Sequence, residues 1–393
     1  MKIAFFSRGS GSGSGRAVRL AVAGCALFAV GASGTPAPVT GPPDPLLTPG
    51  TQVRPAAGAP EVPEVSALSW VVADARSGDV LAAHDAHRRL PPASTLKTLF
   101  ALALLPRVPE GRHRATGAEL AGVGEGSSLV GVEAGRDYAV DDLWRGVFLS
   151  SGNDAVHVLS AMAGGTRAAV ARMQDTARKL GARDTRVVSP DGYDAPGQVS
   201  SAYDLAVFGR AGLRDPRFTK YCRTAAARFP GRGGVYDIRN TNRLLTGADG
   251  VEPYPGAVGV KNGYTSKAGH TLIAAARRGG RTLVVTVLNP QDGGSTTVYE
   301  EARSLLDWGF RAAGRVRPVG SLEPPVAAGP PSSPRPRPSA EHAAAEVAGR
   351  GEGGGTTWRT VALAGCAAAL AAAGTAFGTR RGRRGRAVQG AED

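Results

Sequence analysis

Residues 91–100 have the sequence PPASTLKTLF, in which two prolines lead directly into an apolar segment. Proline favours extended backbone in the residue that precedes it, and no glycine or proline follows between Thr95 and Leu105. The pattern therefore predicts a helix that begins at about Ser94. Lys97 would then lie one helical turn after Ser94, with both side chains on the same face.

The Ser94 and Lys97 pair has the chemistry of an activated nucleophile. A serine hydroxyl needs a base, and a lysine whose charge is disfavoured by burial or by a second cation can accept its proton at neutral pH. The alternative is a Ser94 that only caps the helix and a Lys97 that is solvated. Two clusters later in the chain favour the catalytic interpretation.

The second cluster is Ser151-Gly152-Asn153, which alone would more often be a turn at a helix end. If it lies beside Ser94, the Ser151 hydroxyl could relay a proton towards a leaving nitrogen. The Asn153 amide could bind a substrate amide through hydrogen bonds.

The third cluster is Lys261-Asn262-Gly263, which alone would more often be a β-turn. Lys261 could bind the anionic end of a substrate and disfavour protonation of Lys97. Gly263 on an edge strand would let a substrate backbone approach closely. The backbone N–H groups of Tyr264 and Ser94 could together form an oxyanion hole.

The two ends of the chain have the compositions of targeting and anchoring segments. Residues 1–34 are basic, then apolar, then rich in small residues, as in a signal peptide, and the alternative is a mobile basic tail. Residues 360–379 form an uncharged segment long enough to span a bilayer, although a buried or coiled helix is the alternative. Five arginines follow it within residues 380–393, which predicts a cytoplasmic C-terminus and an extracytoplasmic catalytic domain.

One folded domain is expected between these ends, over residues 65–318. Hairpin patterns occur near both of its ends, with helical patterns between and after them, so we expect an α+β fold: an antiparallel sheet covered by helices, with an inserted helical lobe. Proline and glycine predict a linker over residues 35–64 and a stalk over residues 319–358.

Composition excludes several other classes of function. The formal net charge of +14 is spread along the chain without a stripe of basic and aromatic residues, so we expect no nucleic acid partner. The six histidines and three cysteines have no metal-ligand spacing, and we expect neither a metal nor a cofactor. We expect a monomer.

The order of the three clusters resembles that of the penicillin-recognising serine D-alanyl-D-alanine carboxypeptidases, a branch of the low-molecular-mass penicillin-binding proteins. The resemblance covers about residues 66–312. The segments that carry it are residues 69–85, 91–97, 149–155, 240–245 and 259–269.

The resemblance implies removal of the terminal D-Ala from peptidoglycan stem peptides through an acyl-enzyme. By position, Ser94 would be the nucleophile and Lys97 its base, Ser151 and Asn153 the second motif, and Lys261 the ligand of the substrate carboxylate. It also implies a five-stranded antiparallel sheet with an all-α second lobe, and acylation of Ser94 by β-lactams.

The chain departs from the family pattern at Asn262, where Thr or Ser is usual, and in having a stalk and a spanning segment in place of a β-rich domain. Two alternatives remain at this point. A serine β-lactamase shares the motif layout, but its commonest class needs a glutamate between the second and third motifs, and only Glu252 lies there. A membrane-tethered penicillin-binding or wall-binding module with little turnover is the other.

Overall fold

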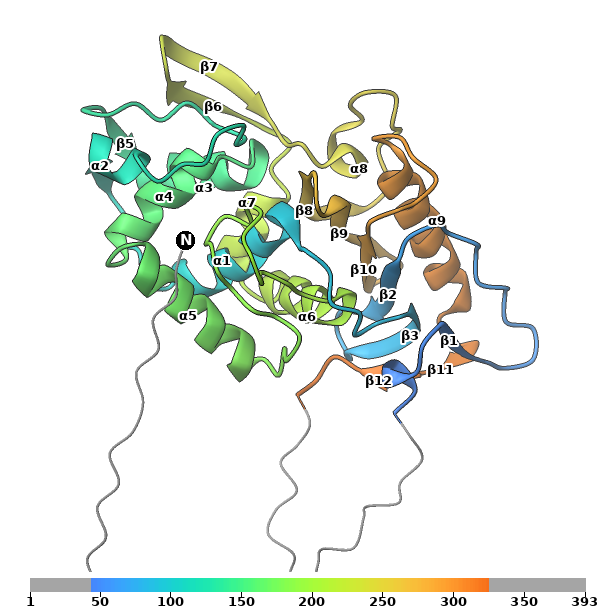
Figure 1. Ribbon diagram of the computed structural model, residues 1–393. Helices are drawn as coiled ribbons and strands as arrows, with labels where there is room; N and C mark the ends of the chain where they lie inside the picture. The colour runs from blue at the N-terminus through green and yellow to red at the C-terminus, as the bar shows by residue number, and fades with distance from the viewer. Residues whose placement is uncertain (1–43, 325–393) are drawn as a thin grey trace, which may run out of the picture. The chain divides into compact units, whose positions relative to one another are not determined.

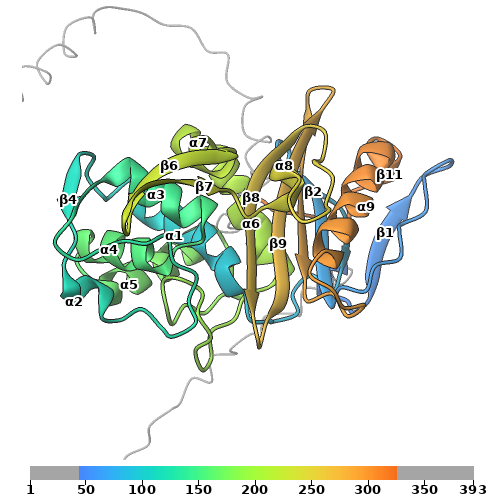
Figure 2. The ribbon, with the colours of Figure 1, turned by 90° about the horizontal axis from the view of Figure 1, so that it is seen from above.

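The computed structural model describes residues 44–324, and an antiparallel sheet organises them (Figures 1 and 2). The strand order is β11-β1-β3-β2-β10-β9-β8, with β12 paired to β3. The strands are β1 (Thr51–Pro55), β2 (Ser69–Asp74), β3 (Asp79–His84), β8 (Ala257–Thr265), β9 (Gly269–Arg278), β10 (Arg281–Leu288), β11 (Val316–Arg317) and β12 (Gly320–Ser321). The predicted five-stranded sheet corresponds to β3-β2-β10-β9-β8, and the fold class is confirmed.

Helices cover both faces of the sheet, which explains why its central strands are apolar on both sides (Figure 2). One face packs against α9 (Thr297–Ala312), through a core that includes Trp308 and Val285. The other face packs against α6 (Ala202–Leu213), through a core that continues into the helical lobe. The buried faces fix the strand register, since a one-residue slip would expose them.

A mainly helical lobe is inserted between β3 and β8, as expected, but it is not all-α, because it also contains two short strand pairs (Figure 1). Its main helices are α1 (Lys97–Leu104), α3 (Val140–Leu149), α4 (Asn153–Met162), α5 (Thr166–Lys179) and α7 (Pro216–Cys222). Shorter elements are the 3-10 turn Ala93–Leu96, α2 (Gly117–Leu120), α8 (Arg243–Thr246), the pair β4 (Arg112–Arg114) and β5 (Asp137–Ala139), and the hairpin β6 (Ala226–Gly231) and β7 (Gly234–Arg239). The sequence patterns did not predict this last hairpin.

The predicted linker over residues 35–64 is wrong for part of its length. A 3-10 turn at Pro45–Leu47 is followed by β1, which pairs with β3 and β11, and Leu46 is buried. The high Pro and Gly content concealed this short strand, which completes the edge of the sheet beside β3. The predicted domain end at residue 318 is also too early, because Val319 N–H donates to Val80 O at 2.9 Å and β12 follows.

The predicted signal peptide over residues 1–34, most of the stalk, the spanning segment 360–379 and the basic tail lie outside the described residues. Within residues 44–324, no helix is both long and apolar enough to cross a bilayer.

Candidate active site

Ser94 lies in a strained and closely packed turn where the chain enters α1. The predicted helix start at this residue is a 3-10 turn, and Ala93 just before it has a φ of 49°, which is uncommon for a residue with a Cβ atom. The hydroxyls of Thr95 and Thr271 both donate to Pro92 O, the second across 3.0 Å from β9. These bonds fix the backbone that presents the Ser94 hydroxyl.

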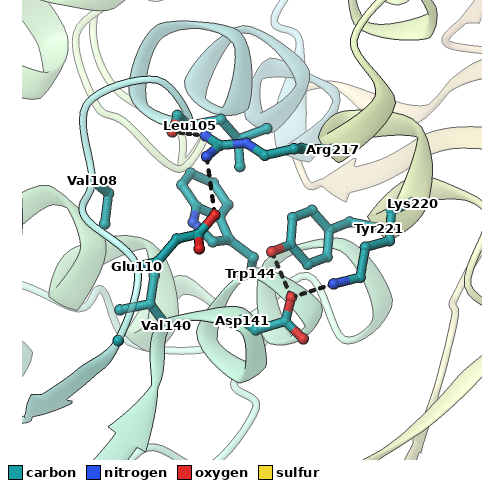
Figure 3. Close-up of a pocket in the computed structure, with 10 residues that line it drawn as sticks. Leu105, Val108, Glu110, Val140, Asp141, Trp144, Arg217, Lys220 and Tyr221 are labelled. Carbon is teal, nitrogen blue, oxygen red and sulfur yellow. Dashed lines mark hydrogen bonds and ion pairs between the residues drawn. The ribbon is translucent and has the colours of Figure 1, made fainter.

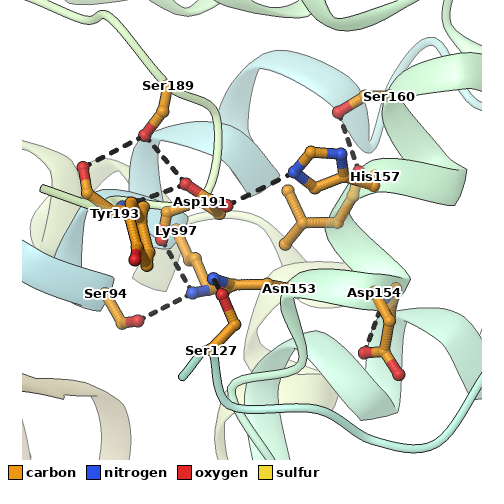
Figure 4. A network of polar contacts seen from close by, with 12 residues as sticks. Ser94, Lys97, Ser127, Asn153, Asp154, His157, Ser160, Ser189, Asp191 and Tyr193 are labelled. Carbon is orange, nitrogen blue, oxygen red and sulfur yellow. Dashed lines mark hydrogen bonds and ion pairs between the residues drawn. The ribbon is translucent and has the colours of Figure 1, made fainter. Parts of the chain in front are cut away.

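Lys97 directly contacts Ser94, as the three-residue spacing predicts. Its Nζ donates to Ser94 Oγ at 2.7 Å and to Asp191 O at 2.7 Å, and the side chain is 1% exposed (Figure 4). Burial lowers the pKa of Lys97 to about 8, although the negative charges of Asp191 and Asp154 oppose the shift. A neutral amine beside the hydroxyl is therefore accessible near neutral pH.

Ser151 and Asn153 lie in the connection from α3 to α4 and bear two polar atoms without a partner. Ser151 has a φ of 57°, and its Oγ is buried with no hydrogen bond within residues 44–324. Asn153 Nδ2 donates to Ser127 Oγ at 2.9 Å, whereas its Oδ1 is buried and unpaired in the same described part of the chain. Buried polar atoms are rarely unpaired, so this pair is suited to receive a ligand.

Lys261, in β8, is buried beside Lys97. It is 1% exposed, and its Nζ donates to Asn262 O at 2.8 Å. Burial, and then the positive charge of Lys97, hold the pKa of Lys261 well below its ordinary value. The two amines therefore repel each other in a poorly solvated site, where two full positive charges are costly.

Gly263 brings β8 into contact with the 3-10 turn Ala93–Leu96, which bears Ser94 and is called the nucleophile turn below. A Cβ atom at Gly263 would lie only 2.6 Å from Ser94 N, which leaves no room for a larger residue. β8, which bears Tyr264, is the last strand in the sheet order. It is therefore an edge strand, and no other strand of residues 44–324 pairs with its outer side. Ser94 N and β8 are thus close together, and the oxyanion hole formed by the N–H groups of Ser94 and Tyr264 stays a prediction.

Asn262, also in β8, is held by a hydrogen bond from Thr241. Thr241 Oγ1 donates to Asn262 Oδ1 at 2.9 Å, and Thr241 N–H donates to Leu149 O at 2.9 Å at the end of α3. The segment 240–245 therefore joins the strand that bears the third cluster to the helix that precedes the second.

These groups surround one cleft of about 470 Å³. Ser94, Asn153 and Tyr264 line it, whereas Lys261 is buried and Ser151 and Asn262 are not among its lining residues. Tyr193 Oη donates to Glu125 O at 2.9 Å, so two loops of the helical lobe meet at the cleft. The structure thus brings all three clusters to one region.

Sequence patterns missed the partners that hold the site together, namely Asp191, Ser127 and Thr241. Asp191 and Ser127 lie in loops whose composition predicts only a turn, and Thr241 lies in a segment to which the family resemblance gave no role. Each acts across a long separation in the chain. One residue in the sequence did indicate that such partners exist: the Asn153 amide needs hydrogen-bond partners if it is buried. Within residues 44–324 no cluster of His, Cys, Asp and Glu could hold a metal ion.

A second cavity, of about 450 Å³, lies among α1, α3 and α7 and does not contain Ser94 (Figure 3). Its charged groups are paired with one another: Lys220 Nζ lies 2.7 Å from Asp141 Oδ1, and Arg217 Nη1 lies 3.6 Å from Glu110 Oε1. It therefore has no reactive group comparable with Ser94.

Comparison with known proteins matches this site to a family. The family model described as D-alanyl-D-alanine carboxypeptidase matches residues 56–292, more than half of the chain. The chain belongs to the D-alanyl-D-alanine carboxypeptidase family. As a member it is a serine-type peptidase with the serine DD-peptidase fold.

Among its relatives is the D-alanyl-D-alanine carboxypeptidase DacB2 of Mycobacterium tuberculosis, 40% identical over 274 residues, which cover 69% of this chain and 90% of the relative. DacD of Escherichia coli, also named a D-alanyl-D-alanine carboxypeptidase, is 36% identical and aligns over 64% of this chain and 65% of its own length. A solved D-alanyl-D-alanine carboxypeptidase from M. tuberculosis H37Rv is 39% identical, with a TM-score of 0.62, over 69% of this chain and 100% of that chain.

Proposed function

We propose that this protein removes the terminal D-Ala from peptidoglycan stem peptides that end in D-Ala-D-Ala, through an acyl-enzyme on Ser94. The observation that carries the proposal is the 2.7 Å contact between Ser94 Oγ and the buried amine of Lys97, in a cleft that Asn153 and Tyr264 also line. It supplies a nucleophile and a base in hydrogen-bond contact.

In acylation, Ser94 Oγ bonds to the carbonyl carbon of the penultimate D-Ala, and its proton passes to Lys97 Nζ. The backbone N–H groups of Ser94 and Tyr264 stabilise the negative charge that develops on the carbonyl oxygen. The bond to the terminal D-Ala nitrogen then breaks, and that nitrogen takes up the proton that Lys97 accepted, relayed through Ser151, which leaves Lys97 neutral again. An ester remains on Ser94.

In deacylation, a water molecule attacks the ester carbonyl and gives its proton to Lys97. The Ser94 hydroxyl is then restored, and the shortened peptide leaves as a carboxylate. The same base serves both half-reactions, because the second is chemically the reverse of the first with water in place of the amine.

Substrate binding would determine which of the two buried lysines, Lys97 or Lys261, carries the positive charge. Without substrate, burial lowers the pKa of Lys97, and burial together with the charge of Lys97 lowers the pKa of Lys261. A substrate carboxylate beside Lys261 would favour the charged form of that amine. Lys97 would then be the neutral amine at the moment when Ser94 needs a base. The Asn262 amide, oriented by Thr241, would add a hydrogen-bond donor to the carboxylate.

β-Lactams would acylate the same hydroxyl, since they resemble the D-Ala-D-Ala end. A serine β-lactamase remains the alternative enzyme, and rapid loss of the penicillin adduct would indicate it. Glu252, the one glutamate between the second and third clusters, is exposed, and the residues that line the cleft do not include it. The cleft therefore lacks that candidate for activating the deacylating water.

Release of D-Ala from diacetyl-lysyl-D-Ala-D-Ala tests the proposal. We expect steady release by the wild-type protein and none above background for Ser94→Ala. A binding module with little turnover would release none in either form. Release that is unchanged in Ser94→Ala would place the nucleophile elsewhere.

We also propose that residues 1–34 direct export and residues 360–379 anchor the protein in the cell membrane, with the C-terminus in the cytoplasm. The support is the charge and length of these segments. Extraction of membranes at alkaline pH tests the anchor. The full-length protein should remain in the pellet, and a form that ends at residue 358 should be released.

A further inference from the structure

A buried contact between a histidine and a carboxylate lies behind the base of the reaction, on the side away from Ser94 (Figure 4). His157 Nε2, from α4, is 3.4 Å from Asp191 Oδ2, and both side chains are almost completely buried. The backbone carbonyl of Asp191 is the one that accepts from Lys97 Nζ. A single residue therefore connects the pair to the base.

The Asp191 carboxylate is held at both oxygens. Its Oδ1 accepts from Ser189 Oγ at 2.8 Å and from Tyr193 N–H at 2.9 Å, and His157 faces Oδ2. The next residue, Gly192, has a φ of 85°, and a Cβ atom there would lie 2.0 Å from Ala93 O. This loop therefore packs directly on the nucleophile turn, so the carboxylate's position bears on the catalytic geometry.

The charge of Asp191 also acts on Lys97. Burial would raise the pKa of Asp191, but His157, Lys97 and the hydrogen bonds from Tyr193 and Ser189 outweigh it and lower the pKa, so the carboxylate is ionised. An ionised carboxylate at this position favours the charged form of Lys97, which cannot act as a base.

Other charged groups near His157 have their own partners. Glu119 of α2 and His157 both line a surface cavity of about 280 Å³. The Oε1 atom of Glu119 lies 2.8 Å from His113 Nε2. Asp154, on the same helix, accepts from the N–H groups of residues 130–132 and points away in Figure 4. Asp191 is thus the carboxylate within ion-pair distance of His157.

We propose that His157 is a positioning residue for the reaction: its contact with the Asp191 carboxylate fixes the loop whose backbone carbonyl accepts from Lys97 Nζ. This inference rests on the proposed function, in which Lys97 is the base. It assigns a role to a residue outside the three clusters.

The test is the pH dependence of kcat/KM for D-Ala release from diacetyl-lysyl-D-Ala-D-Ala by the full-length protein. His157→Ala removes the contact with Asp191 and should lower kcat/KM by about tenfold, whereas His157→Gln keeps a hydrogen-bond donor and should retain most of it. Asp191→Asn removes the negative charge, so the acidic limb should move to lower pH. His113→Gln, at a histidine that does not contact Asp191, should leave the limb in place.

A loss in folded His157→Ala that His157→Gln largely avoids, together with a limb displaced to lower pH in Asp191→Asn, would support the proposal. Wild-type kcat/KM in His157→Ala, or a loss in folded His157→Gln as large as the loss in His157→Ala, would overturn the inference while leaving the proposed function intact. Absence of release by the wild-type protein would instead overturn both.

Discussion

At the residue scale, the site depends on how burial changes the chemistry of Lys97. In water this amine would carry a proton and could not accept another from Ser94. At 1% exposure, and close to the second buried amine of Lys261, the charged form is disfavoured. The fold therefore gives Ser94 a hydrogen-bonded amine that loses its proton more readily than it would in water.

The pKa of about 8 for Lys97 predicts a pH dependence. Since only the neutral amine accepts the Ser94 proton, the rate of acylation by penicillin should increase as the pH rises through about 8. Stopped-flow measurement of acylation between about pH 6 and about pH 10 checks this. A rate that falls over that range would rule out a lysine base.

Asn262 offers a prediction about substrate binding. Asn262→Asp keeps the shape of the side chain but brings a negative charge towards the substrate carboxylate, so kcat/KM for D-Ala release should fall by about tenfold or more. Asn262→Thr, which places a hydroxyl donor there, is the matched variant and should retain activity. Equal activity of the Asp variant and the wild type would exclude contact between this side chain and the carboxylate.

At the element scale, the edge strand β8 and the nucleophile turn must approach each other closely. The short contact at Gly263 and the bond from Thr271 Oγ1 to Pro92 O hold them together. The sequence predicted each of these elements, because proline boundaries and period-two alternation are local signals. It could not predict the loop with Asp191, whose role arises only from a contact with Lys97 across 94 positions of the chain.

Gly263→Ala tests that approach. The added methyl group would have to displace the backbone at Ser94, and a misplacement of this kind should reduce the acylation rate by about 10²-fold. Gly117→Ala, where an added Cβ meets nothing within 4 Å, is the control and should acylate normally. An unaffected rate in Gly263→Ala, measured with a fluorescent penicillin, would contradict the close packing.

At the scale of the whole molecule, the folded unit extends beyond the predicted boundaries of 65 and 318. The motifs lie inside the described fold, on strongly patterned helices and strands. The ends were harder, because β1 and β12 are short and lie in segments rich in proline and glycine. Their stabilisation comes from partners far away in the chain, such as the pairing of β1 with β11.

The difference in boundaries predicts a difference in stability. A fragment of residues 65–318 lacks buried Leu46, β1 and the Glu323 carboxylate that pairs with buried Arg210. Loss of the Leu46 contacts alone should cost about 2 kcal/mol, which corresponds to a melting temperature several degrees below that of residues 44–324. Thermal unfolding of both fragments by circular dichroism measures it, and equal midpoints would show that the added segments contribute nothing.

The most direct test of the catalytic account is mass spectrometry of the purified protein after incubation with benzylpenicillin. The account predicts one covalent adduct with the full mass of the penicillin, located by proteolysis on the peptide that contains Ser94 and absent from Ser94→Ala. An adduct on another residue, or none at all in a folded protein, would contradict it.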